Sequence, residues 1–229
     1  MTSKRTAIVL GGSGSVGMAL LRELFRSDGE FAAVVTLSRR SLPEAVALAA
    51  STGRKLVEKL VPEMKPAPLA AATLEVAREV EGDLEGFSVL GVGANTAKLS
   101  LEEHRAVDVE LNEAFARALR DSGKVQLLAF MSAVGADRAA STAGSGAAGM
   151  SRYNRVKGES EDAVRASGPA LVSVFRPAMI IGSRHTPWLL EKALPLLSFA
   201  TPGKFKSISV DQIANAMVAS ANRHPAKSD

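Results

Sequence analysis

Short apolar runs alternate with longer helical patterns along most of this 229-residue chain, and no other feature constrains its fold as strongly. Strands joined through a helix run parallel, and a parallel sheet needs helices on both faces because its strands are buried on both sides. The sequence therefore predicts an α/β fold with a doubly wound parallel sheet. The expected strands are Ala7–Leu10, Ala33–Leu37, Leu56–Val61, Ser88–Gly91, Gln126–Ser132 and Leu171–Phe175.

Three segments between these strands have the spacing of amphipathic helices. In residues 16–25, Val16, Leu20 and Leu24 recur four residues apart and fall on one face. Residues 69–80 and 101–121 show the same kind of pattern. We found no internal repeat, and the rhythm of strands and helices continues from end to end. One domain is therefore expected, covering residues 1–229.

Two segments interrupt the rhythm. Residues 139–150 consist almost wholly of Ala, Gly, Ser and Thr, which bury little surface, so we expect a mobile loop there. Residues 62–68 carry three prolines and predict a stiff surface connection.

Composition excludes several classes of site. The chain has no Cys, which rules out disulfides, thiolate metal sites and a cysteine nucleophile. The three histidines, His104, His185 and His224, are too scattered to predict a zinc site, and no metal is expected. Basic residues exceed acidic ones by 28 − 24 = 4 and are spread along the chain, so nucleic acid is not an expected partner.

The sequence also bears on location. No stretch reaches the roughly 18 to 20 apolar residues that span a bilayer. Only six residues precede the first apolar run, which leaves no room for a leader peptide. We therefore expect a cytoplasmic protein, with organelle targeting left open if the chain has been trimmed.

A glycine-rich turn follows the first strand and opens the first helix. Glycines three residues apart permit a tight turn, a close approach of the backbone to a pyrophosphate and close packing of helix on sheet. The free N–H groups at the start of the helix would then face the anion. Without such a ligand, the pattern would simply be a flexible turn. The candidate nucleotide-binding residues are Gly11, Gly12, Ser13, Gly14, Ser15, Val16 and Gly17.

The end of the second strand bears on the choice of nucleotide. An acid at this position would accept hydrogen bonds from the adenosine ribose of NAD, whereas a 2′-phosphate needs a cation. The chain has Ser38-Arg39-Arg40 here, and its nearest acids, Asp28 and Glu30, precede the strand. Arginine matches phosphate geometry, so we predict NADP(H) in preference to NAD(H). The alternative is that both arginines belong to a solvated turn.

Tyr153 and Lys157 form the second chemical signal. Four residues apart on a helix, the two side chains lie on one face. A phenol is a poor acid-base catalyst at neutral pH, but a fixed cation beside it stabilises the phenolate and lowers its pKa. Tyr153 is the only tyrosine of the chain, which favours a specific role. The alternative is a tyrosine ring packed on the helix beside a solvated lysine.

Together these features resemble the short-chain dehydrogenase/reductase superfamily in its atypical, extended-like branch, over nearly the whole chain. The residues that carry the resemblance are Gly11–Gly17, Tyr153 with Lys157, and the run Val174–Gly182. Met131–Asp137, Val156–Glu159 and Ser173–Pro177 are similar to the Tat-interacting-protein oxidoreductases, a group related to NmrA-like regulators.

The resemblance implies a Rossmann-type fold and roles for particular residues. Lys157 would contact the nicotinamide ribose, and Tyr153 would donate a proton to a carbonyl. Pro177 and Ala178 would offer backbone groups to the carboxamide, and residues 183–229 would form a small substrate-side portion. The turn after the fourth strand, expected to line the adenine side, consists of Gly91, Val92, Gly93 and Ala94.

The chain departs from the family at two positions. Asp108 stands where many relatives have an Asn that supports a proton relay. Relatives also place a catalytic hydroxyl just past the fifth strand, where this chain has Ala133, with Ser132 one residue earlier. If the strand ends by Met131, Ser132 reaches the site. If it continues, Ser132 points to the other face, because neighbouring strand residues alternate. We favour the first arrangement and include Ser132 with Tyr153 and Lys157 as catalytic.

These residues predict an NADP(H)-dependent oxidoreductase that reduces a small carbonyl compound. The alternative is a nucleotide-binding regulatory protein of NmrA-like type with little or no turnover. A nucleotide-sugar or lipid-modifying enzyme is disfavoured, because only 229 − 182 = 47 residues follow Gly182. The resemblance also implies a homodimer through residues 101–121 and 153–166, and it allows for a regulatory protein partner.

Overall fold

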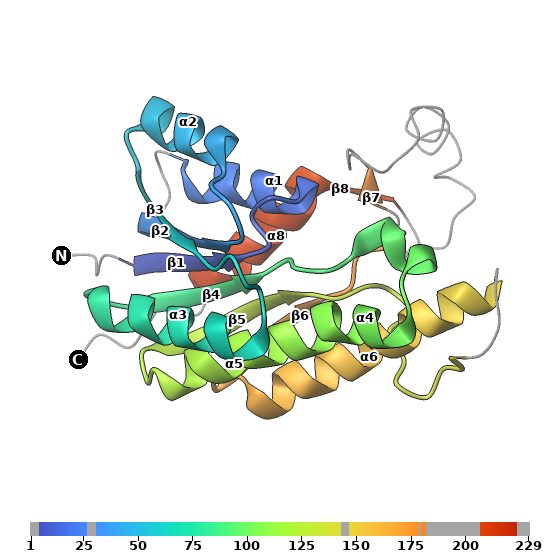
Figure 1. Cartoon of the computed structure of the whole chain (residues 1–229). Helices are drawn as coiled ribbons and strands as arrows, with labels where there is room; N and C mark the ends of the chain where they lie inside the picture. The colour runs from blue at the N-terminus through green and yellow to red at the C-terminus, as the bar shows by residue number, and fades with distance from the viewer. Residues whose placement is uncertain (1–4, 27–30, 143–146, 179, 182–206, 224–229) are drawn as a thin grey trace.

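Six parallel strands form the central sheet of this computed structural model, which describes residues 5–26, 31–142, 147–178, 180–181 and 207–223 (Figure 1). Their order is β3-β2-β1-β4-β5-β6, so the direction of winding reverses between β1 and β4. This is the doubly wound Rossmann arrangement, and the predicted fold class is confirmed. The strands are β1 (Arg5–Leu10), β2 (Phe31–Ser38), β3 (Lys55–Leu60), β4 (Leu84–Ser88), β5 (Val125–Met131) and β6 (Leu171–Phe175).

Helices cover both faces of the sheet (Figure 1). Successive residues of β1 alternate between two hydrophobic clusters, with Ala7 and Val9 in one and Ile8 and Leu10 in the other. On the Val9 face lie α1 (Ser15–Leu24), α2 (Pro43–Thr52) and α8 (Val210–Arg223); on the Ile8 face lie α3 (Pro66–Glu79), α5 (Leu111–Asp121) and α6 (Ala147–Ser167).

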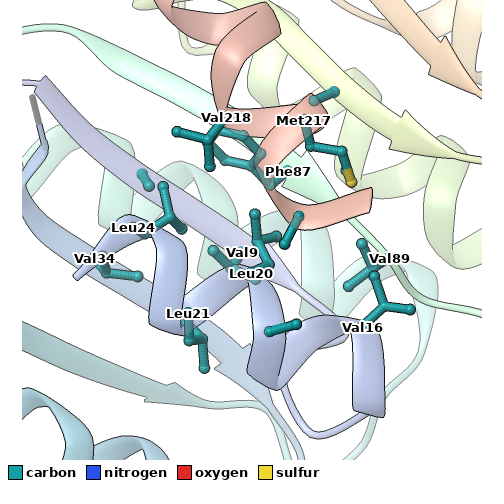
Figure 2. Close-up of a cluster of buried hydrophobic side chains, with 14 of the residues drawn as sticks. Val9, Val16, Leu20, Leu21, Leu24, Val34, Phe87, Val89, Met217 and Val218 are labelled. Atoms are coloured by element: carbon teal, nitrogen blue, oxygen red, sulfur yellow. The ribbon is translucent and has the colours of Figure 1, made fainter. Parts of the chain in front are cut away.

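The C-terminal helix α8 completes the core on the Val9 face. Figure 2 shows Met217 and Val218 of α8 beside Leu20 of α1 and Phe87 of β4. All four side chains are buried, which favours folding by about 1.5–3 kcal/mol for each large apolar group. Of the C-terminal portion expected on the substrate side, 182–206 and 224–229 lie outside the described residues. A short parallel pair, β7 (Ile180–Ile181) and β8 (Ile208–Ser209), precedes α8.

Several boundaries differ from those predicted. The fourth strand is Leu84–Ser88 rather than 88–91, and it contains a buried Glu85 and a glycine. Helices α2 and α8 have no counterpart among the helices expected from the sequence, which were 16–25, 69–80, 101–121 and 153–166. Helix α3 begins at Pro66, inside the proline-rich connection, because the fixed φ of proline suits a first helical turn. Within the described residues, no helix is long and apolar enough to cross a membrane.

The predicted mobile loop and the predicted long helix also differ from expectation. Helix α6 already begins at Ala147, so residues 139–150 are not all loop, and 143–146 lie outside the described residues. Residues 101–121 form one helical run, but its middle is a π-helical turn, Ala106–Glu110, between α4 (Leu101–Arg105) and α5.

Candidate active site

The predicted site residues follow the carboxyl ends of neighbouring strands or lie on α6. Because the strands are parallel, their carboxyl ends meet at one edge of the sheet, and doubly wound sheets bind ligands at this edge where the winding reverses, here between β1 and β4. The glycine turn follows β1, Ser38 ends β2 with Arg39 and Arg40 directly after it, and the Gly91 turn follows β4. Ser132 follows β5 and Pro177 follows β6. The fold thus brings the predicted cofactor residues to a single edge.

The glycines at positions 11, 14 and 17 of the first turn do not all have the same purpose. Gly11 has φ +91° and a Cβ there would lie 2.7 Å from the backbone nitrogen of Leu90. A Cβ at Gly17 would lie 2.2 Å from the carbonyl oxygen of Gly11. Both positions therefore require glycine for packing within the protein. A Cβ at Gly14 would approach only the Gly11 oxygen, at 3.6 Å, so the surface at Gly14 is open.

Helix α1 begins at this open surface. Its N-cap is Gly14, which has no side chain to cap the first N–H groups, and its first turn carries no acidic residue. Such a helix start attracts an anion through its N–H groups and its dipole. Ser13 and Gly14 are exposed, and Ser15 is half-buried. The cradle formed by glycine at 11, 14 and 17 therefore fits the pyrophosphate of a dinucleotide.

Arg39 and Arg40 lie at the same sheet edge as the glycine turn, since Leu10 of β1 pairs with Leu37 of β2. Both arginines are exposed, and within the described part of the chain neither is paired with a carboxylate. The Ser38 hydroxyl donates to the carbonyl of Arg40 at 2.7 Å, which shapes the turn. Two unpaired guanidinium groups beside the crevice are chemically able to bind a phosphate.

The turn after β4 contacts the catalytic candidates. Gly91 and Gly93 are exposed, Val92 is half-buried, and Gly93 has φ +59°. Ala94 lies in a 3-10 turn, Gly93–Lys98. A Cβ at Gly91 would lie 3.0 Å from both the Lys157 ammonium and a carboxylate oxygen of Asp108. Glycine at this position therefore makes room for the pair.

Lys157 is 3% exposed, and its Nζ lies 2.6 Å from Oδ1 of Asp108. The second oxygen of Asp108 accepts the Val92 N–H at 2.9 Å. Burial opposes the charge on the ammonium, but the neighbouring acidic groups, Asp108 first with Tyr153 and Glu161, together raise the pKa of Lys157 above its ordinary value. Lys157 is therefore a fixed cation inside the site.

Tyr153 lies one turn before Lys157 on α6, with the ammonium 5.7 Å from the centre of its ring. The His104 ring stacks on the Tyr153 ring, with centroids 6.0 Å apart and 21° between the planes. The predicted pairing of Tyr153 and Lys157 on one helix face is thus present in the fold. An imidazole and a cation are therefore both neighbours of the phenol ring.

His104 is a neighbour that sequence reasoning did not place in the site. It is fully buried, and within the described part of the chain neither ring nitrogen has a hydrogen-bond partner. Burial lowers the pKa of His104, which the Asp108 carboxylate, 3.8 Å from Nε2, opposes without cancelling. Its spacing of four residues from Asp108 on a helix was the one available signal.

Ser132 lies beyond the last residue of β5, yet its N–H still donates to the carbonyl of Phe175 at 2.7 Å, as in a continuing ladder. Its side chain is 2% exposed and near enough to Glu161 to lower the pKa of that carboxyl. No hydrogen bond of normal geometry joins the two among the described residues. Glu161 is two turns of α6 beyond Tyr153, or about 12 Å along the helix axis.

Arg176 directly precedes Pro177 and Ala178, the last of the predicted cofactor-binding residues. Its guanidinium donates to both oxygens of Glu161, at 2.8 and 2.5 Å. Burial opposes ionisation of Glu161, but this pair outweighs it and holds the pKa below its ordinary value. Pro177 has no N–H, and its carbonyl already accepts the Val134 N–H at 2.8 Å. Ala178, half-buried, is thus the better placed of the two to offer a backbone N–H.

Comparison with known proteins gives one sequence relative. The chain is 30% identical over 191 residues to the mitochondrial protein Fmp52 of Aspergillus fumigatus, covering 83% of this chain and 73% of that protein. No family model matches the chain.

Solved structures share the fold at low sequence identity. A short-chain dehydrogenase/reductase from Serratia marcescens superimposes with a TM-score of 0.67 at 19% identity, covering 95% of this chain and 90% of that one. An alcohol dehydrogenase from the archaeon Thermococcus sibiricus, complexed with 5-hydroxy-NADP, gives 0.65 at 19% identity, covering 96% and 91%.

Proposed function

The chain belongs to the family of Fmp52 and has the short-chain dehydrogenase/reductase fold, and from this premise we propose that it is an NADP(H)-dependent oxidoreductase acting on a small carbonyl compound. One observation carries the proposal. The open, uncapped helix start at Gly14 and the Tyr153–Lys157 pair belong to the same edge of the sheet, as a dinucleotide and its substrate require.

The residues divide the work of binding. The first N–H groups of α1, reached past Gly14, bind the pyrophosphate. Arg39 and Arg40 bind the 2′-phosphate, and the turn from Gly91 to Ala94 lines the adenine side. Lys157 gives one N–H to Asp108 and keeps two for the nicotinamide ribose. A nicotinamide nucleotide would supply the hydride.

Tyr153 supplies the proton. As negative charge builds on the substrate oxygen, the phenol O–H donates its proton to that oxygen, and the resulting phenolate faces the Lys157 cation. The stacked His104 ring limits the orientations open to the phenol. Ser132 remains a candidate to hold the substrate oxygen, which requires its hydroxyl to turn away from Glu161.

Consumption of NADPH with a panel of small aldehydes and ketones tests this function. We expect turnover that Tyr153→Phe abolishes, by about 100-fold or more, because the proton donor is lost. Tyr153→Phe keeps the ring against His104 and so preserves packing. Ser132→Ala is the matched comparison: full activity in this variant would leave the Tyr153 role intact and remove the hydroxyl role.

A regulatory protein of NmrA-like type is the second candidate, and the position of Ser132 favours it. The Ser132 hydroxyl faces Glu161, and Ala133 occupies the position where relatives carry the hydroxyl. Catalysis would then rest on two residues and be slow. Tight NADPH binding without consumption of any carbonyl compound would support this candidate and overturn the first.

The exposed arginine pair supports a preference for NADPH. A bidentate arginine–phosphate contact contributes on the order of 1.5–3 kcal/mol, so NADPH should bind at least about tenfold more tightly than NADH. Arg39→Ala should narrow this ratio in a fluorescence titration. Arg117→Ala, on the distant helix α5, is the control and should leave the ratio unchanged. Equal affinities in the unmodified protein would contradict the preference.

Assembly and location complete the proposal. We propose a homodimer through the α4–α5 run and α6, which sedimentation would test. A regulatory partner protein belongs to the second candidate function. We propose a cytoplasmic location, whereas the name of the Aspergillus relative includes "mitochondrial". Imaging of the tagged protein distinguishes the two compartments.

A further inference from the structure

Asp108 is a buried carboxylate that the proposed chemistry does not use, although it contacts the ammonium on which that chemistry depends. It is 0% exposed. One oxygen lies 2.6 Å from Lys157 Nζ, and the other accepts the Val92 N–H at 2.9 Å. The carboxylate therefore joins helix α6 to the turn after β4, on which the nucleotide would lie.

The backbone around Asp108 is fixed in place. Asp108 is the middle residue of the π-helical turn, where the regular helical hydrogen bonds are displaced. Its carbonyl accepts hydrogen bonds from Asn112, at 2.9 Å, and from the buried Ser160 hydroxyl of α6. These contacts hold the carboxylate against Lys157, in the space that glycine at position 91 leaves open.

The pair changes the charge that Tyr153 meets. Lys157 alone would present a full positive charge 5.7 Å from the ring centre, but the charges of Lys157 and Asp108 together sum to zero. Burial lowers the pKa of His104 and so disfavours its charged form. The other charged groups near the pair are Glu159, which binds Arg105 and Arg155, Glu161, which binds Arg176, and Arg152, which donates to the Thr96 carbonyl and whose charge acts on His104.

We propose that Asp108 is a positioning residue that balances the charge of Lys157 and so limits the stabilisation that Lys157 gives to a Tyr153 phenolate, which favours the phenol as the proton donor in carbonyl reduction. This inference rests on the proposed function for its role in catalysis. Its electrostatic part concerns only residues of this chain. A neutral pair still offers two ammonium N–H groups to a ribose, but it stabilises a phenolate less than an isolated cation does.

The single tyrosine allows a direct test. Tyr153 is the only phenol of the chain, so the ultraviolet absorbance of phenolate formation reports this site alone. In Asp108→Asn the Lys157 charge is no longer balanced, and the phenolate should appear at lower pH than in the unmodified protein. The expected shift is about one to two pH units, the order of magnitude for a unit charge within the same site at an effective dielectric constant of about 20.

A double variant keeps the test decisive if Asp108→Asn fails to fold. Asp108→Asn with Lys157→Met removes both charges and leaves no buried ion unpaired. If the pair is neutral to Tyr153, the phenolate should form in the double variant within about half a pH unit of the unmodified protein. Formation at a pH more than one unit higher would mean that Lys157 acts as an uncompensated cation, and would overturn the proposal.

Asp162→Asn is the matched control. Asp162 lies on the same helix, but its side chain is 49% exposed and pairs with Arg138 in solvent, so its loss should leave the phenolate signal unchanged. An unchanged signal in a folded Asp108→Asn protein would also overturn the proposal.

The activity arm separates this inference from the proposed function. In Asp108→Asn, the alkaline limb of the pH profile of kcat/KM for carbonyl reduction should move to lower pH by the same amount as the phenolate signal. If no carbonyl compound is turned over, the oxidoreductase function fails, while the absorbance titration still decides the role of Asp108.

Discussion

Two buried ion pairs lie at opposite edges of the same sheet, and their charges meet at different distances. At the carboxyl edge, Lys157 and Asp108 approach to 2.6 Å. At the amino edge, Arg5 of β1 and Glu85 of β4 remain 3.7 Å apart. All four side chains are buried. The first pair supports the candidate site, and the second lies where no predicted site residue is found.

The difference arises from what else each cation binds. Arg5 donates to the carbonyl of Ala221, at 3.0 Å, and to the side chain of Asn222, at 2.6 Å, and so holds the end of α8. Among the described residues, one oxygen of Glu85 has no hydrogen-bond partner. Burial therefore raises the pKa of Glu85 to about 7, despite the opposing charge of Arg5.

The comparison teaches that burial of an ion pair does not by itself keep both groups charged. The Lys157 ammonium lies 2.6 Å from the Asp108 carboxylate, and this contact helps to keep the pKa of the ammonium high. Arg5 donates to Asn222 of α8 at 2.6 Å, and its carboxylate partner, with a pKa of about 7, is only partly ionised near neutral pH. The distance between the charges decides which pair resists neutralisation.

Removing the cation at the carboxyl edge should have the largest effect. Lys157→Met leaves Asp108 buried without its ammonium, which we expect to lower the free energy of unfolding by about 3–5 kcal/mol in a denaturant titration at neutral pH. The double variant with Asp108→Asn should recover most of that loss. A loss below about 1 kcal/mol in Lys157→Met would contradict the described difference, in which the Lys157–Asp108 pair stays charged and the Arg5–Glu85 pair does not.

Glu85→Gln should act in the opposite direction. Because the pKa of Glu85 is raised to about 7 in the folded protein, its proton binds more tightly there than in the unfolded chain. The stability from this group is complete below about pH 4.5 and is lost as the pH rises through 7. Glutamine mimics the neutral acid, so the variant should match the unmodified protein near pH 5 and exceed it at pH 8 by about 1–3 kcal/mol.

Arg5 and Asp83 are the charged groups that act on Glu85, and both remain in the variant. Unfolding curves of the two proteins across this pH range provide the measurement. A stability difference that does not change with pH would contradict the assignment to Glu85.

The smallest effect on the free energy of unfolding is expected from removing the exposed ion pair between α1 and α8. Arg22 of α1 lies 3.1 Å from Asp211 of α8, with side chains 50% and 72% exposed. Exposed pairs contribute little, so Arg22→Ala should change the free energy of unfolding by no more than about 0.5 kcal/mol. Thermal unfolding would measure this. A loss above about 1 kcal/mol would show that the exposed ion pair, and not the buried Arg5, anchors the C-terminal helix.

The sequence predicted the parallel sheet and five of its strands closely, because short apolar runs separated by helical patterns are a local property of the sequence. The fourth strand was predicted at 88–91 instead of Leu84–Ser88, because a charged residue and a glycine, Glu85 and Gly86, are uncommon in buried strands. Gly86 is needed because a Cβ would lie 2.4 Å from Leu119 of α5, and Glu85 is tolerated because Arg5 approaches it. Neither reason is visible without the packed helices.

The candidate site divides in the same way. The glycine turn and the shared helix face of Tyr153 and Lys157 could be predicted from the sequence, because each depends on residues that are close together in the chain. The pairing of Asp108 with Lys157, the stacking of His104 on Tyr153 and the position of Ser132 beside Glu161 were decided by the tertiary structure. Each contact joins side chains from different segments, and only the packing of α4, the π-helical turn and β5 against α6 determines which groups meet.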